Sequence, residues 1–62
     1  MNGKKISVLV VEDNTHMLRI LATMIRGFGV DEVHMAADPA DALELIKTTP
    51  VDIIFIDYLN IC

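Results

Sequence analysis

The sequence is poor in several residue types, and each shortage excludes a class of protein. Its 62 residues contain one cysteine, no tryptophan and only 5% aromatic residues. A single cysteine cannot form an internal disulfide, so a disulfide-stapled secreted fold is excluded and a reducing, cytoplasmic location is expected. Five basic residues stand against nine acidic ones, for a net charge of −4. Without a basic stripe to neutralise phosphates, nucleic acid is not an expected partner.

Long hydrophobic runs are also missing. The first apolar run is broken after a few residues by Glu12 and Asp13, so neither a secretory signal nor a membrane span is expected. No repeat or linker divides the chain, and residues 1–62 are predicted to form one domain. Yet 53% of the residues are apolar, whereas a chain this short buries only about 60% of its unfolded surface. This excess predicts association with another chain.

Two short apolar runs end in acidic residues. Residues 8–11 (Val-Leu-Val-Val) precede Glu12 and Asp13, and residues 53–56 (Ile-Ile-Phe-Ile) precede Asp57. Short β-branched runs of this kind are typical of strands buried on both faces. If the two strands are parallel neighbours, the three carboxylates meet in the crevice where open α/β sheets bind ligands. Crowded carboxylates repel one another and need a proton or a cation, and their oxygens suit Mg²⁺.

Strand and helix patterns alternate along the chain. Strands are predicted over 6–11, 30–36 and 51–57, and helices over 15–27 and from 39 to about 47. Parallel strands joined by right-handed crossovers then give the strand order 2-1-3, with the two helices on opposite faces. The predicted fold class is therefore α/β, with a βαβαβ chain order.

The helices carry capping signals and apolar stripes. Asn14 and Asp38 are predicted N-caps, and Pro39 suits the first helical position. The core-facing stripe of the first helix is predicted to comprise Met17, Leu21, Met24 and Phe28, widened by Leu18, Ile20 and Ile25. The residues predicted to face the core from the second helix and the second strand are Ala42, Leu43, Ile46, Val33 and Met35.

Together these segments resemble the response regulator receiver domain, the CheY-like flavodoxin fold. The resemblance is carried by residues 8–14, 38–43 and 50–57 and covers essentially the whole chain. Each segment alone is a weak signal, but two acids after the first strand and a lone Asp after the third, with these helices between, form a specific combination. The resemblance implies a receiver-type phosphoacceptor of two-component signal transduction. It also implies a sensor histidine kinase or a phosphotransfer protein as partner.

The resemblance also implies roles for individual residues. Asp57 would be the aspartyl phosphate acceptor, and Glu12, Asp13 and Asp57 would bind Mg²⁺ together with the backbone carbonyl of Leu59. The implied chemistry is in-line attack of the Asp57 carboxylate on a phosphohistidine. A receiver of this type is not expected to be an enzyme in its own right.

The chain departs from the receiver pattern in length. The family has five strands, and the hydroxyl residue after the fourth and the lysine after the fifth have no counterpart here. The expectation is a truncated receiver whose switching is impaired. Its third strand would have a bare apolar edge, which predicts a homodimer with strand order 2-1-3-3′-1′-2′ or an exchange of elements. The alternative function is a non-catalytic, self-associating structural module.

Overall fold

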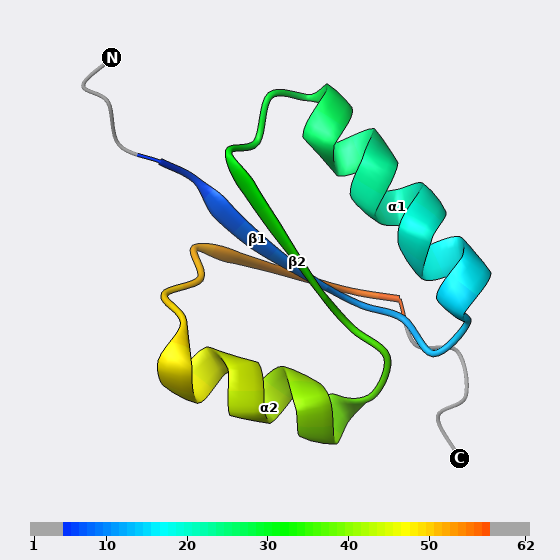
Figure 1. Cartoon of the computed structure of the whole chain (residues 1–62), viewed down its shortest axis with the longest axis vertical. Coiled ribbons are helices and arrows are strands. Elements are labelled where there is room, and N and C mark those ends of the chain that lie inside the picture. Colours follow the sequence, from blue (N-terminus) through cyan, green and yellow to red (C-terminus); the bar gives the residue numbers. More distant parts are fainter. Residues whose placement is uncertain (1–4, 58–62) are drawn as a thin grey trace.

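The computed structural model describes residues 5–57, and its helices and strands follow one another in the predicted order (Figure 1). The elements are β1 (Ser7–Val11), α1 (Thr15–Gly27), β2 (Glu32–Ala36), α2 (Pro39–Thr48) and β3 (Ile53–Ile56). The strand β1 lies between β2 and β3 and runs parallel to both. The predicted strand order 2-1-3 is therefore confirmed, although β2 and β3 are each shorter than predicted.

Both helices begin at the predicted N-caps. The Asn14 side chain accepts a hydrogen bond of 2.9 Å from the backbone N–H of Met17. In the same way the Asp38 carboxylate accepts a hydrogen bond of 2.9 Å from the backbone N–H of Asp41. Each contact satisfies one of the backbone donors that a helix leaves free in its first turn. After α1 the chain turns at Gly29, whose φ of 93° suits a residue without a Cβ.

The strand β1 is the centre of the core, and all five of its residues are buried. Because successive side chains point to opposite faces of a sheet, β1 contributes to two separate apolar clusters. Val8 and Val10 pack toward α1, and Leu9 and Val11 pack toward α2. The two helices thus cover opposite faces, as predicted.

The face that α1 turns to the sheet is displaced from the predicted stripe. The residues that pack against the sheet are Leu18, Leu21, Ala22 and Ile25. Four residues that were predicted to face the core are exposed, so the prediction is wrong for them: Met17, Ile20, Met24 and Phe28. Apolar residues occur on two adjacent sides of α1, and both sides satisfy helical spacing. Only the contact with β1 and β2 decides between them.

A similar correction applies to α2 and β2. Ala42 is buried and Leu45 packs beside it, whereas Leu43 and Ile46 are exposed. Met35 of β2 is exposed as well. The predictions of core positions for Leu43, Ile46 and Met35 are therefore wrong. On α2 the reason is geometric, because one flank of the helix lies over the sheet and the other faces the open side above β3.

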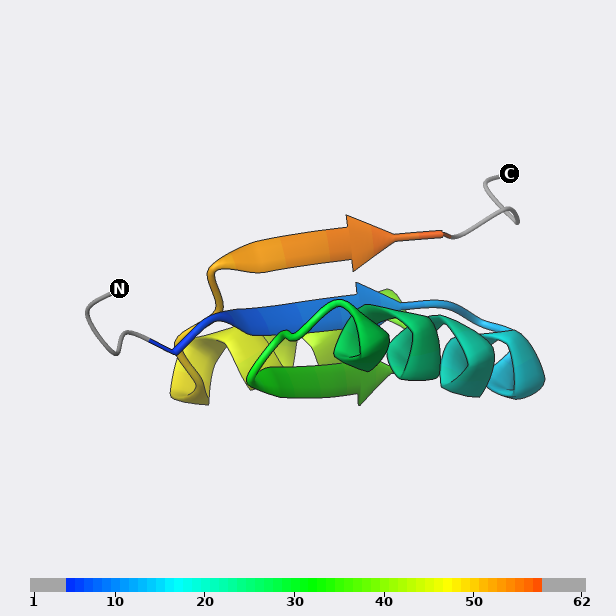
Figure 2. The ribbon, with the colours of Figure 1, turned by 90° about the horizontal axis from the view of Figure 1, so that it is seen from above.

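The strand β3 is exposed along its whole length. Its four apolar residues keep between 44% and 66% of their surface accessible. Both helices contact β1 and β2, and Figure 2 shows β3 lying to one side of them. The prediction that β3 is buried on both faces is therefore wrong for this chain, because neither helix extends far enough to cover it.

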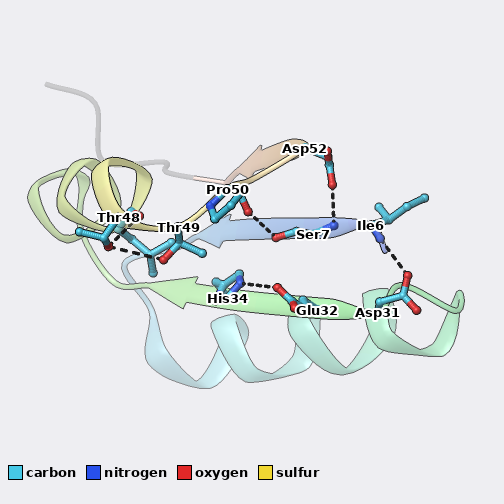
Figure 3. A network of polar contacts seen from close by, with 10 residues as sticks. Ile6, Ser7, Asp31, Glu32, His34, Thr48, Thr49, Pro50 and Asp52 are labelled. Carbon is cyan, nitrogen blue, oxygen red and sulfur yellow. Dashed lines mark hydrogen bonds and ion pairs between the residues drawn. The ribbon is translucent and has the colours of Figure 1, made fainter. Parts of the chain in front are cut away.

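Polar contacts join the strands at the end of the sheet where they begin (Figure 3). The Asp52 carboxylate accepts a hydrogen bond of 2.9 Å from the Ser7 N–H. The Ser7 hydroxyl donates a hydrogen bond of 3.0 Å to the Pro50 carbonyl. The Asp31 carboxylate accepts a hydrogen bond of 2.8 Å from the backbone N–H of Ile6. These side chains satisfy backbone groups at the start of β1 and before β3, and they hold the segment before β3 beside β1.

Candidate acidic site at the carboxyl ends of the strands

Backbone hydrogen bonds place two of the three predicted acidic residues at the same end of the sheet, where the strands end. Glu12 follows β1, and its N–H donates to the Ala36 carbonyl at the end of β2, at 3.1 Å. Asp57 follows β3, and its N–H donates to the Val11 carbonyl at 2.9 Å. Parallel neighbouring strands thus bring both residues to their common carboxyl end, as predicted from the sequence.

The Glu12 side chain is held back against the start of α1. It is only 5% exposed, and its Oε2 accepts a hydrogen bond of 2.9 Å from the backbone N–H of Asn14. Sequence reasoning identified Asn14 as an N-cap but missed this contact. The available signal was a carboxylate two residues before a helix N-cap, where free backbone N–H groups gather.

The neighbouring carboxylates perturb the ionisation of Glu12. The Asn14 N–H favours the charged form and lowers the pKa. Burial, a side-chain hydrogen bond with Asp13 and the negative charges of Asp57 and Asp13 all act in the opposite direction, and together they raise the pKa above its ordinary value. Both neighbouring carboxylates therefore act electrostatically on Glu12.

The three carboxylates of the acidic cluster, Glu12, Asp13 and Asp57, differ in how far they are exposed. Asp57 is half-buried, and Asp13 is exposed in the segment between β1 and α1. Within residues 5–57, no three His, Cys, Asp or Glu side chains are placed so that they could together hold a metal ion. Leu59, whose carbonyl was predicted as a further ligand, lies outside the described residues. The ligand set thus remains a prediction.

An apolar groove of about 220 Å³ lies beside the cluster, between α2 and β3. Its lining residues are Val11, Pro39, Ala42, Leu43, Ile46, Ile54 and Ile56. The exposed flank of α2 therefore faces one side of β3 across open space. In the described part of the chain, neither helix has the length and apolarity needed to cross a membrane.

The arrangement agrees with a comparison to protein families. The family model of the response regulator receiver domain matches residues 8–59 of the 62. The chain belongs to the response regulator receiver family. Neither a curated protein nor a solved structure gave a significant match.

Membership of the receiver family confirms the resemblance drawn from the sequence and agrees with the observed fold. The three parallel strands and two helices form a flavodoxin-like half-fold of the α/β class. Receiver domains take part in two-component signalling, interact with histidine kinases or phosphotransfer proteins, generally bind Mg²⁺ and are generally not enzymes. In this receiver the acidic residues at the carboxyl ends of β1 and β3 are the candidates for that chemistry.

Proposed function

We propose that this chain is a receiver-type phosphoacceptor and that Asp57 is the residue that takes the phosphoryl group. One observation carries the proposal: the backbone bond from Asp57 to Val11 holds Asp57 at the end of β3, beside the buried Glu12. A half-buried carboxylate at this place is accessible to a donor and is surrounded by groups that fix its backbone.

The proposed chemistry is a direct phosphoryl transfer. A carboxylate oxygen of Asp57 attacks the phosphorus of a phosphohistidine on a sensor histidine kinase or a phosphotransfer protein. The new P–O bond forms as the P–N bond breaks, and the imidazole nitrogen keeps the electron pair of that bond. The chain would act in the cytoplasm, where its single cysteine stays reduced.

The donor set is chemically suited to Mg²⁺. Carboxylate oxygens are ligands that this ion prefers. Burial raises the pKa of Glu12, and the negative charges of Asp57 and Asp13 raise it further; a cation would relieve the repulsion from these two charges. Glu12, Asp13 and Asp57 would hold the ion, with the Leu59 carbonyl as a further ligand. When bound, Mg²⁺ would neutralise charge on the phosphoryl oxygens during transfer.

Intact-mass measurement tests the proposal directly. The protein is incubated with Mg²⁺ and a small phosphodonor such as acetyl phosphate, and one added phosphoryl group is expected on the wild type. Asp57→Asn should abolish the added mass. Asp52→Asn is the matched control, because Asp52 lies before β3 at the opposite end of the sheet, and this variant should be labelled like the wild type. An unlabelled wild type, under conditions that label an authentic receiver, would refute the proposal.

A second candidate function is a self-associating structural module, and the exposure of β3 favours it. Among the described residues, β3 pairs along one edge only, with β1, and its side chains are accessible on both faces. An apolar strand with a free edge is a template for pairing with another chain. The proposed assembly is a homodimer in which β3 meets its own copy antiparallel, in the strand order 2-1-3-3′-1′-2′. Sedimentation equilibrium at micromolar concentration measures the mass of this assembly.

A further inference from the structure

Asn14 is held by hydrogen bonds that join the start of α1 to the acidic residues. Its side-chain oxygen accepts a hydrogen bond of 2.9 Å from the Met17 N–H, and its carbonyl accepts one of 2.8 Å from the Leu18 N–H. Its own N–H donates a hydrogen bond of 2.9 Å to Oε2 of Glu12. One residue therefore begins the helix and at the same time contacts a predicted Mg²⁺ ligand.

The Glu12 carboxylate has little freedom in this arrangement. It is buried, and a buried polar group needs a partner for its hydrogen bonds. The Asn14 N–H is one such partner, and the Asp13 side chain is another. The backbone of Glu12 is fixed separately, by its hydrogen bond to the Ala36 carbonyl. Because a free glutamate side chain samples several rotamers, these contacts select one orientation of the carboxylate before any ion binds.

The backbone conformation of Asn14 is what allows both of its contacts. Its φ of −88° and ψ of 112° are extended, as is usual for a residue that caps a helix. The hydrogen bond from the Met17 N–H to the side chain holds Asn14 in this conformation, and the conformation sets the direction of its own N–H. The side chain of Asn14 thus acts on Glu12 through the Asn14 backbone.

We propose that Asn14 is a positioning residue of the acidic site, and that by capping α1 it orients the Glu12 carboxylate for Mg²⁺. This inference rests on the proposed function, in which Glu12 is a ligand of the ion. Replacing a residue that orients a metal ligand typically weakens metal affinity by about 10–100-fold. A ligand that is already ordered also loses less side-chain freedom on binding. Asn14 therefore raises the affinity for the ion without being a ligand itself.

Two matched pairs of proteins separate positioning from helix stability. At the α1 cap, the wild type is compared with Asn14→Ala. At the α2 cap, Asp38→Asn is compared with Asp38→Ala, so that each pair differs by the same change from asparagine to alanine and by no charge. Both alanine variants lose a hydrogen bond to a helix backbone and should lower the urea midpoint similarly. Isothermal titration calorimetry measures the Mg²⁺ dissociation constant of all four proteins.

The two caps should differ in their effect on Mg²⁺. The dissociation constant should rise roughly tenfold from the wild type to Asn14→Ala. It should stay nearly constant from Asp38→Asn to Asp38→Ala, because the α2 cap shares no hydrogen-bond partner with Glu12. Asn14→Ser retains a side-chain acceptor and should recover most of the affinity. Circular dichroism of each variant establishes that it is folded.

Asn14→Gly is a second variant that keeps the test independent of folding. Glycine lacks the side-chain acceptor, yet at a helix cap it costs far less stability than alanine does. Its backbone is also free to leave the extended conformation. Asn14→Gly should therefore bind Mg²⁺ about as weakly as Asn14→Ala while its urea midpoint stays close to that of the wild type.

A double-mutant cycle identifies the route of the effect. In a Glu12→Gln background, Asn14→Ala should change the Mg²⁺ dissociation constant much less, because the group that Asn14 orients has lost its charge. A change as large as in the wild type would show that Asn14 acts on the ion by a route that does not include Glu12, and would overturn the inference.

The outcomes separate this inference from the proposed function. If the wild type and Asn14→Ala bind Mg²⁺ equally well, the positioning role is overturned and the ligand set stands. Equal losses of affinity at both caps would show that affinity follows helix stability, and would also overturn it. A wild type that binds no Mg²⁺ overturns the ligand set and the positioning role together. The phosphoacceptor role of Asp57 is measured separately, by the mass of the protein after treatment with a phosphodonor.

Discussion

The backbone N–H of Asp57 donates a hydrogen bond of 2.9 Å to the carbonyl oxygen of Val11, the residue before Glu12. This bond sets the first residue after β3 beside the end of β1. A one-residue shift between the two strands would turn the side chains that follow β3 to the other face of the sheet. The candidate site therefore depends on the register between β1 and β3.

Mg²⁺ is expected to stabilise the folded protein. A ligand that binds only the native state adds about 2.7 kcal/mol to the free energy of unfolding at a hundredfold excess over its dissociation constant. Urea unfolding with and without Mg²⁺ measures this increment. Asp57→Asn and Asp13→Asn should each lose most of it. Asp41→Asn, at the start of α2, should keep it. Equal stabilisation of all three variants would contradict the predicted ligands.

The stability of the metal-free protein should depend on the ionisation of Glu12. Its pKa in the folded state is raised above the ordinary value of 4.5, so between these two values the folded protein binds more protons than the unfolded chain. The free energy of unfolding should therefore fall as the pH rises through this window, and the loss should be complete above the raised pKa. Urea unfolding in buffers with a chelator measures the dependence.

Glu12→Gln is the variant that isolates this effect. The amide keeps an oxygen that can accept from the Asn14 N–H but carries no charge, so the part of the pH dependence due to Glu12 should disappear. Added Mg²⁺ should also offset the loss in the wild type, because it favours the ionised carboxylate. A wild type whose stability rises with pH across the window would contradict the assigned cause.

Leu9 is expected to be indispensable for folding. It has 0% exposure and packs on the α2 side of β1, so Leu9→Ala should cost about 2–5 kcal/mol. A domain of this size has little stability to lose. Leu43→Ala is the matched control, since Leu43 is 58% exposed on α2, and it should cost much less. Circular dichroism during urea titration compares the two variants, and similar midpoints would contradict the packing described for β1.

The N-cap of α2 should contribute measurably to stability. Asp38→Ala removes the acceptor of the Asp41 N–H and should lower the free energy of unfolding by about 1 kcal/mol. Asp38→Asn retains an oxygen at the same place and should remain close to the wild type. The same urea titration measures both changes. If the two variants lose stability equally, the cap acts through its charge rather than through the hydrogen bond.

Local patterns in the sequence were sufficient for the elements and their order. The caps at Asn14 and Asp38 and the acidic ends of two apolar runs are short-range signals, because each depends on neighbours within a few residues. Strand order followed from the handedness of the crossovers, which the backbone imposes on any chain of this pattern. Glu12 and Asp57 lie at the same end of the sheet as a consequence of that order.

Contacts between distant segments decided the rest. Whether α1 buries Leu18 or Met17 depends on how the helix is rotated over β1 and β2, and apolar residues on both sides left the sequence pattern undecided. The exposure of β3 depends on the width of sheet that two helices can cover. The hydrogen bond from the Asn14 N–H to the Glu12 carboxylate depends on the conformation of the segment between β1 and α1, which the sequence pattern does not give. Periodicity reports which residues are apolar and how they are spaced, but burial is a property of the surface that another element covers.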